Sequence, residues 1–149
     1  MFTLDRDNGN LIIDFTVGDP EHPDLEPTVT RVVVAPPPTT GDYWLLREKI
    51  DEINRGRDQL SAQLLADNDV GAAEMTSRIN GWQEDQVLEW WKMVMFGDTM
   101  YPPRATPPPP TDIKVWPLYL VNADAMQQAL AHWKTVPLEY GASPVPKMS

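Results

Sequence analysis

The sequence predicts an α+β protein, and three patterns along its 149 residues point to that class. Alternating apolar residues flank an Asn-Gly pair near the start, which indicates short antiparallel strands. Apolar residues then recur at helical spacing through the middle third, and proline dominates much of the remainder. We therefore expect three segments: an N-terminal β-hairpin or short sheet with a proline-rich linker (1–41), a central antiparallel, coiled-coil-like helical hairpin (42–96), and a proline-rich C-terminal extension with an edge strand and a short helix (97–149).

The first segment is expected to hold two or three strands. The runs Phe2–Leu4 and Leu11–Val17 flank Asn8-Gly9, and both turn residues tolerate the positive φ that a tight hairpin requires. A further β-branched run, Thr28–Ala35, ends at three consecutive prolines. Because so few strands are only marginally stable alone, this element should pack against another part of the chain or against a partner.

The middle segment begins with a long predicted helix. Its apolar positions recur every three or four residues and form a heptad seam, with one arginine at a core position. The seam residues are Leu46, Ile50, Ile53, Arg57, Leu60 and Leu64. Thr40 or Asp42 is a candidate cap for the start of this helix, and Asp69 is a candidate cap for the helix that follows.

The second helix should span about 70–96. Its apolar residues keep the same spacing as far as Trp82, and the seam then shifts by one place to Val87. Two pairings of the seam are possible: the two helices can pack against each other within one chain, or the seam can pack against the seam of another subunit. In the second case Arg57 would set the register or the number of subunits, and we expect a homo-oligomer with a trimer favoured over a dimer.

The last segment is expected to be mostly extended. Tyr101–Pro110 should form a polyproline II linker or arm. The apolar run Ile113–Val121 contains Pro117, which restricts it to an edge strand or an extended arm. Asn122 is a candidate cap for a short helix that ends near Lys134, and the tail 137–149 should be irregular.

The composition argues against most catalytic and nucleic-acid-binding classes. The chain has no cysteine, two histidines and a formal net charge of −10. Nucleic acid is not an expected partner, because a phosphate backbone is bound by clustered Lys and Arg. A signal-peptide pattern and an apolar run of membrane-spanning length are both missing, so we expect a soluble protein made in the cytosol. We assign no catalytic residues, cofactor or metal, and we do not expect an enzyme.

Six tryptophans and sixteen prolines favour a role in protein assembly. Tryptophan often anchors interfaces, and polyproline stacks on aromatic rings, so these two features can also pair with each other, within or between chains. Adjacent helical residues point about 100° apart. Trp90 and Trp91 therefore cannot enter one seam together, and one of them needs a second surface, in the same chain or in another. The candidate interaction residues are Trp44, Arg57, Trp90, Trp91, Tyr101, Trp116 and Trp133.

Three parts of the chain carry a family resemblance. They are the opening Phe2–Asp5 with its Asn-Gly hairpin, the arm Val34–Asp42, and the ending Trp116–Asp124 with Ala129–Trp133. In these parts the chain resembles the small minor tail proteins of long-tailed bacteriophages that infect actinobacteria. The resemblance implies a structural virion component near the tail tip, made in the host cytoplasm, that binds neighbouring tail subunits in several copies.

Two other functions stay open from the sequence. A tail-assembly chaperone or adaptor that never enters the virion would have the same kind of composition. An acidic inhibitor of a host nucleic-acid enzyme would use the negative charge, which lies mainly before residue 97.

Overall fold

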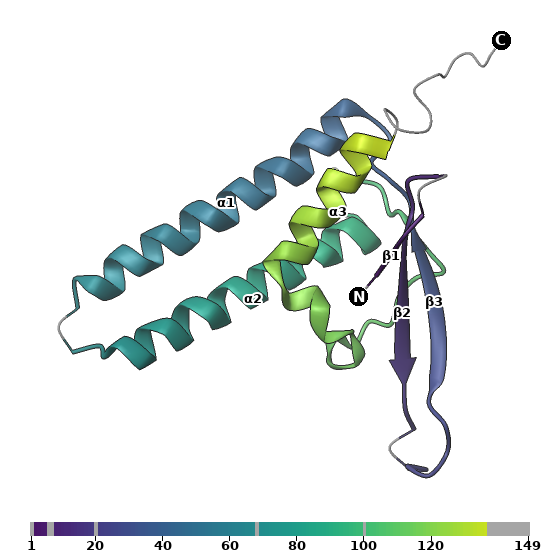
Figure 1. Ribbon diagram of the computed structural model, residues 1–149, viewed down its shortest axis with the longest axis horizontal. Helices are drawn as coiled ribbons and strands as arrows, with labels where there is room; N and C mark the ends of the chain where they lie inside the picture. The colour runs from purple at the N-terminus through teal and green to yellow at the C-terminus, as the bar shows by residue number, and fades with distance from the viewer. Residues whose placement is uncertain (1, 6–7, 20, 68, 100, 137–149) are drawn as a thin grey trace.

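The computed structural model describes residues 2–5, 8–19, 21–67, 69–99 and 101–136. Within these ranges the chain forms an antiparallel sheet, three α-helices and two 3₁₀-helices, so the α+β class is confirmed. The elements in chain order are β1 (Thr3–Leu4), β2 (Leu11–Val17), β3 (Thr28–Val34), α1 (Thr40–Leu65), α2 (Ala72–Phe96), β4 (Ala105–Thr106), η1 (Ile113–Val115), η2 (Leu118–Val121) and α3 (Ala123–Val136). The long α1–α2 hairpin extends away from the sheet, and α3 crosses its base (Figure 1).

The strands are ordered β1-β2-β3-β4 in the sheet. The predicted Asn-Gly hairpin joins β1 to β2: Gly9 has a φ of 77°, and its amide donates to the carbonyl of Asp5 at 2.9 Å. The predicted β-branched run is β3, which pairs with β2 along its whole length. The far end of this ribbon projects beyond the rest of the sheet (Figure 1), because β1 and β4 pair only with the opposite end.

The proline-rich segment supplies the fourth strand, which the sequence analysis did not predict. β4 pairs Ala105 with Val34, and the amide of Ala35 donates to the carbonyl of Arg104 at 2.9 Å. This part of the predicted polyproline arm is therefore a strand held against the sheet. The physical reason is local: Arg104, Ala105 and Thr106 interrupt the prolines and carry the backbone donors that a ladder needs.

Both predicted long helices are present, but their caps differ from those predicted. Thr39 caps α1, and its Oγ1 accepts a hydrogen bond from an amide of the first turn at 3.1 Å. α2 starts after Gly71, which makes no side-chain cap bond, so the prediction of Asp69 as its cap is wrong. α2 ends at Gly97, which has a φ of 76° and no room for a Cβ, because that atom would lie 2.6 Å from the carbonyl oxygen of Tyr101.

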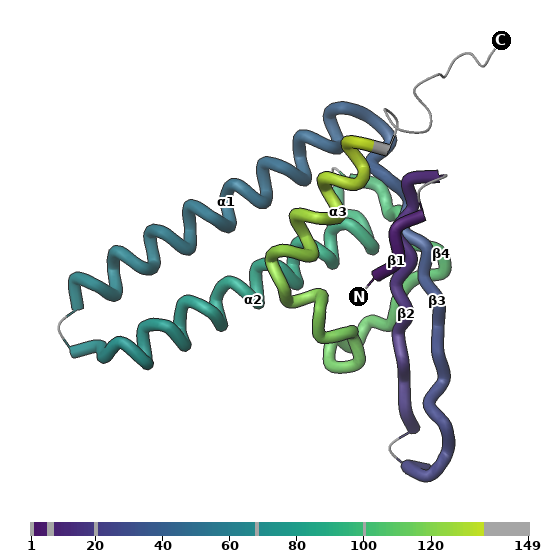
Figure 2. The backbone as a smooth tube through the Cα atoms, in the orientation of Figure 1, coloured from purple at the N-terminus to yellow at the C-terminus, as the bar shows by residue number. Residues whose placement is uncertain are grey.

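The heptad seam closes within one chain. Buried residues of α1 and α2 meet along the base of the hairpin, so the structure adopts the intramolecular pairing. The buried seam residues there are Leu46, Ile50, Ile53, Val87, Trp90 and Val94. Beyond α3 the hairpin continues alone towards its connecting loop (Figure 2), and most of its side chains in that part are exposed.

The prediction of an edge strand over 113–121 is wrong, because this segment forms η1 and η2. Asp112 Oδ1 accepts a hydrogen bond from the amide of Lys114 at 3.0 Å and caps η1. Pro117 caps η2, and its carbonyl accepts from the amide of Leu120 at 3.1 Å. Proline lacks the N–H that a ladder uses, whereas its fixed φ suits the start of a helical turn.

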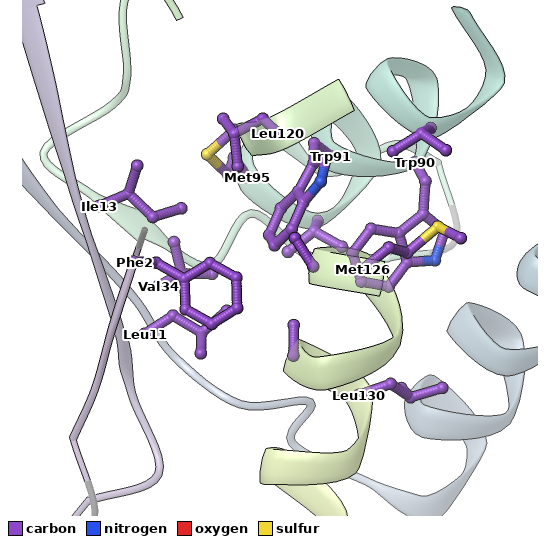
Figure 3. Close-up of a cluster of buried hydrophobic side chains, with 14 of the residues drawn as sticks. Phe2, Leu11, Ile13, Val34, Trp90, Trp91, Met95, Leu120, Met126 and Leu130 are labelled. Carbon is purple, nitrogen blue, oxygen red and sulfur yellow. The ribbon is translucent and has the colours of Figure 1, made fainter. Parts of the chain in front are cut away.

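α3 is present as predicted. Asn122 Oδ1 accepts a hydrogen bond from the amide of Asp124 at 2.8 Å, which confirms Asn122 as the cap. The predicted irregular tail, 137–149, lies outside the described residues. One core joins all three predicted segments, with side chains of the strands, α2 and α3 converging on it (Figure 3). These include Phe2, Leu11, Ile13, Val34, Trp90, Trp91, Met95, Leu120, Met126 and Leu130.

Candidate functional site

Five of the seven predicted interaction residues are part of the core of the single chain. None of the five is more than 7% exposed. They are Trp90, Trp91, Tyr101, Trp116 and Trp133. Their rings pack between the sheet and the helices of one chain. Of the two alternatives, contacts within a chain or between chains, the structure shows the first for these five residues.

Trp90 and Trp91 diverge as the helical geometry predicts. The indole of Trp90 donates to the carbonyl of Leu46 on α1 at 3.1 Å and stacks on Trp133 of α3, with ring centroids 6.4 Å apart. Trp91 turns towards the strands and meets Phe2 edge to face, with centroids 6.1 Å apart. The second surface that one of these rings requires is therefore the β element of the same chain.

Trp116 pairs with the proline tract inside the chain. Its Nε1 donates to the carbonyl of Pro110 at 2.8 Å, and its ring meets Phe15 of β2 edge to face, with centroids 6.1 Å apart. Tyr101, at the other end of the tract, is buried, and burial raises the pKa of its hydroxyl. The tract is thus anchored at both ends by aromatic residues of its own subunit.

Trp44 and Arg57 remain available at the surface. Trp44 projects from the first turns of α1 and is 62% exposed. Arg57 is partly exposed, and its guanidinium lies 3.5 Å from Asp58 Oδ1. Trp44 is therefore the most exposed of the six tryptophans. Arg57 does not lie in a buried seam.

A groove between α1 and α2 is a further candidate site. It has a volume of about 490 Å³. Half-buried apolar side chains from α2 line it, together with charged side chains from both helices. Its lining residues include Ile53, Trp82, Trp90, Met93, Phe96 and Gly97 among the apolar ones, and Lys49, Glu52, Glu89, Lys92 and Asp98 among the charged ones. We call this site the hairpin groove.

The hairpin groove lies on a different face of α1 from α3. α1 turns Tyr43, Arg47 and Ile50 towards α3, where a smaller hollow of about 270 Å³ also touches Leu130. It turns Lys49, Glu52 and Ile53 towards the hairpin groove. α3 thus covers one side of the helical pair, and the other side is left with half-buried apolar residues.

The charges at the hairpin groove are paired within each helix. Lys92 Nζ lies 2.9 Å from Glu89 Oε2 on α2, and Lys49 Nζ lies 3.8 Å from Glu52 Oε1 on α1. These pairs are solvent-exposed, so each contributes little to stability. Each helix presents both signs of charge beside an apolar floor, which is a pattern typical of helix–helix contacts.

Three further groups with shifted pKa values, Asp14, Arg31 and Tyr119, lie on or close to the sheet. Arg31 Nε donates to Asp14 Oδ1 at 2.9 Å across β2 and β3, and this hydrogen bond lowers the pKa of Asp14. Burial raises the pKa of Tyr119 to about 12, and the charge of Asp14 adds to the effect. In the described ranges, no three His, Asp or Glu side chains gather closely enough to hold a metal ion.

Comparisons with known proteins identify no relative: no family model, curated protein or solved structure matches the chain. None of the described helices combines the length and apolar character that crossing a bilayer requires.

Proposed function

We propose that the protein is a structural component of a bacteriophage tail that acts by binding neighbouring protein subunits. The observation that carries this proposal is the hairpin groove, an apolar-floored site of about 490 Å³ on the side of the helical pair that α3 does not cover. Apolar concave surfaces rimmed by charge are typical of protein interfaces. Trp44 supplies a second contact point elsewhere on α1.

The energetics favour a macromolecular occupant of the hairpin groove. Trp82, Met93 and Phe96 are half-buried in the isolated chain. Covering the exposed part of such a side chain stabilises a complex by roughly 1 kcal/mol. Covering all three contributes roughly 3 kcal/mol, which is less than the cost of association, so the occupant must make further contacts beyond the groove, as a protein partner can.

The tail setting is supported by the resemblance of the opening, the Val34–Asp42 arm and the ending to small minor tail proteins. The sequence analysis expected the tryptophans and the proline-rich arms to bind neighbouring subunits. Because five candidate aromatic residues are buried and Trp116 holds the proline tract within its own chain, we assign this binding to the outer surface of the helical hairpin instead.

Mass spectrometry of purified particles of the phage that encodes this chain tests the proposal. We expect the chain to be present in stoichiometric amounts in intact tails. Absence from particles, combined with co-purification with tail subunits from infected cells, would favour the chaperone or adaptor instead. Absence from both would overturn the proposal.

A further inference from the structure

The projecting half of the β2–β3 ribbon has an edge that no other strand covers. One side of β2 pairs with β3 along its whole length. On its other side β2 pairs with β1 only at Leu11 and Ile12, so residues 13–17 have no partner strand there within the described part of the chain. We call this side of residues 13–17 the β2 edge.

The register shows which backbone groups of the β2 edge point outward. The amide of Asp5 donates to the carbonyl of Asn10 at 2.9 Å, so Asn10 turns its backbone groups towards β1. Alternate residues of a strand point their N–H and C=O groups to the same side, and β2 pairs with β3 residue for residue. The backbone groups of Asp14 and Thr16 therefore also point outward, and no strand among the described residues pairs with them there.

The sequence around the β2 edge is acidic. From residue 8 to residue 30 the chain has five acids and no lysine or arginine. η1, which packs against β2, adds Lys114 beside its acidic cap Asp112, so it leaves this balance unchanged. A segment that carries lysine or arginine is therefore attracted to this end of the molecule, and an acidic segment is repelled. The five acids are Asp14, Asp19, Glu21, Asp24 and Glu26.

Asp14 can accept a second cation at the β2 edge. Its carboxylate oxygens accept from Arg31 Nε at 2.9 Å and from Arg31 Nη2 at 3.2 Å, and Arg31 lies directly opposite on β3. The side chain of Asp14 is nevertheless 45% exposed. A carboxylate has about four lone-pair sites, so a cationic side chain that faces Asp14 from an added strand can bond to it as well.

We propose that the β2 edge binds an extended segment of a partner protein that contains lysine or arginine and adds to the sheet as a further strand. The backbone of this segment bonds to the outward groups of Asp14 and Thr16. Its side chains alternate: cations lie beside Asp14 on the outer face, and apolar side chains lie beside half-buried Val17 on the inner face. The β2 edge is separate from the hairpin groove, so this inference does not rest on the proposed function.

The charges also discriminate against two other arrangements. The amide of Ala35 donates to the carbonyl of Arg104, and the same alternation turns the backbone groups of Val29 and Arg31 towards the free edge of β3. A basic strand added there would face the guanidinium of Arg31. A second copy of this chain carries the same formal charge of −10 and an identical acidic ribbon, so it is repelled from the β2 edge.

Hydrogen exchange of the full chain, followed by NMR at residue resolution, tests the inference with two synthetic peptides. One peptide alternates lysine with valine over about seven residues, which is enough to span the edge, and the other alternates glutamate with valine. We expect the lysine peptide at saturation to slow exchange of the Asp14 and Thr16 amides by about tenfold. The amides of Val29 and Arg31 should not respond, and the glutamate peptide should have no effect at either edge.

Two proline substitutions form a matched pair. Thr16 and Val29 lie directly opposite each other, and both point their N–H groups away from the β2–β3 ladder. Either proline therefore removes an outward N–H and retains the ladder bonds. Thr16→Pro should weaken binding of the lysine peptide by about tenfold, and Val29→Pro should leave it nearly unchanged. Exchange of the Phe15 amide, which points towards β3, checks that the ribbon is retained.

Four results would overturn the inference. They are equal binding of the two peptides or binding of neither, protection at Val29 and Arg31 in place of Asp14 and Thr16, equal loss of affinity in both proline variants with the ribbon retained, and protection of the β2 edge that grows with the concentration of the chain alone. The last result would assign the edge to a second copy. The peptide comparison needs no substitution, so it holds even if a proline disrupts the ribbon, and it is independent of whether the chain is found in tails.

Discussion

Gly56 on α1 makes room for the indole of Trp82 on α2. A Cβ at Gly56 would lie 2.4 Å from Cη2 and 2.7 Å from Cζ2 of that ring. The glycine, which would ordinarily weaken a helix interior, thus allows an aromatic ring to lie against the backbone of the neighbouring helix. The same indole lines the hairpin groove.

Replacement of Gly56 by alanine should destabilise the protein. The gain in helix propensity is about 1 kcal/mol, and forcing the ring away costs typically 1–3 kcal/mol, so we expect the free energy of unfolding to fall by about 1 kcal/mol. Urea denaturation measures the change. Gly81→Ala is the matched control, because no atom lies within 4 Å of its Cβ position, and it should stabilise the protein. Equal stabilisation by both substitutions would contradict the close contact.

Trp90→Phe should lower the free energy of unfolding substantially more than Trp44→Phe does. Trp90 is 2% exposed and donates to the carbonyl of Leu46, so its replacement removes buried volume and a buried hydrogen bond between α2 and α1. We expect a loss of about 2–3 kcal/mol by urea denaturation. Trp44 is 62% exposed, and its replacement should change the free energy of unfolding by less than about 0.5 kcal/mol. Similar losses for both variants would contradict the placement of the two rings.

The Asp14–Arg31 pair should make the β2–β3 ribbon less stable at acid pH than at neutral pH. The hydrogen bond from Arg31 lowers the pKa of Asp14 below its ordinary 3.8. Its stabilising effect is therefore fully present above that value and is lost as the pH falls through the lower folded-state pKa. Hydrogen exchange of β2 and β3 amides at neutral and acid pH measures this loss. Asp14→Asn and Arg31→Gln should each reduce the difference between the two conditions, and combining them should add little.

Tyr119 should contribute to unfolding in alkali. Burial raises its pKa from 10.0 to about 12, so the unfolded chain releases the phenolic proton at lower pH than the folded chain does. Stability is then present below pH 10 and decreases as the pH rises towards 12. Tyr119→Phe should reduce this decrease, as measured by urea midpoints across the same range. An unchanged pH dependence in the variant would show that the hydroxyl is not protected in the folded state.

The elements that the sequence predicted well are those with local signals. The Asn8-Gly9 turn, the seam of the helical pair and the Asn122 cap all depend on residues close together in the chain. β4 was missed because two residues among prolines become a strand only when a distant edge, here β3, is available to pair with them. η1 and η2 were missed because the apolar alternation suggested a strand, whereas the backbone is determined by Asp112 and Pro117.

The candidate site was harder to predict than the fold. Composition correctly drew attention to tryptophan, but burial depends on which surfaces meet in three dimensions, and five of the seven candidates lie in the core. In the sequence, Gln86 and Glu89 separate the apolar residues of α2 that line the hairpin groove, which are Trp82, Trp90, Met93 and Phe96. The groove was not predicted because these polar residues hide the pattern, and because Trp90 also belongs to the stronger seam with α1.

The projecting end of the β2–β3 ribbon exposes unpaired backbone on both sides, since β1 and β4 pair only at its base. Bare edges of this kind template fibril growth. Two features oppose that outcome here: Asp14 and Arg31 place charges on the outer face, and the following loop combines acids with prolines, which act as gatekeepers against strand addition. Replacing the acids of that loop by neutral residues should therefore favour aggregation through the exposed strand edges.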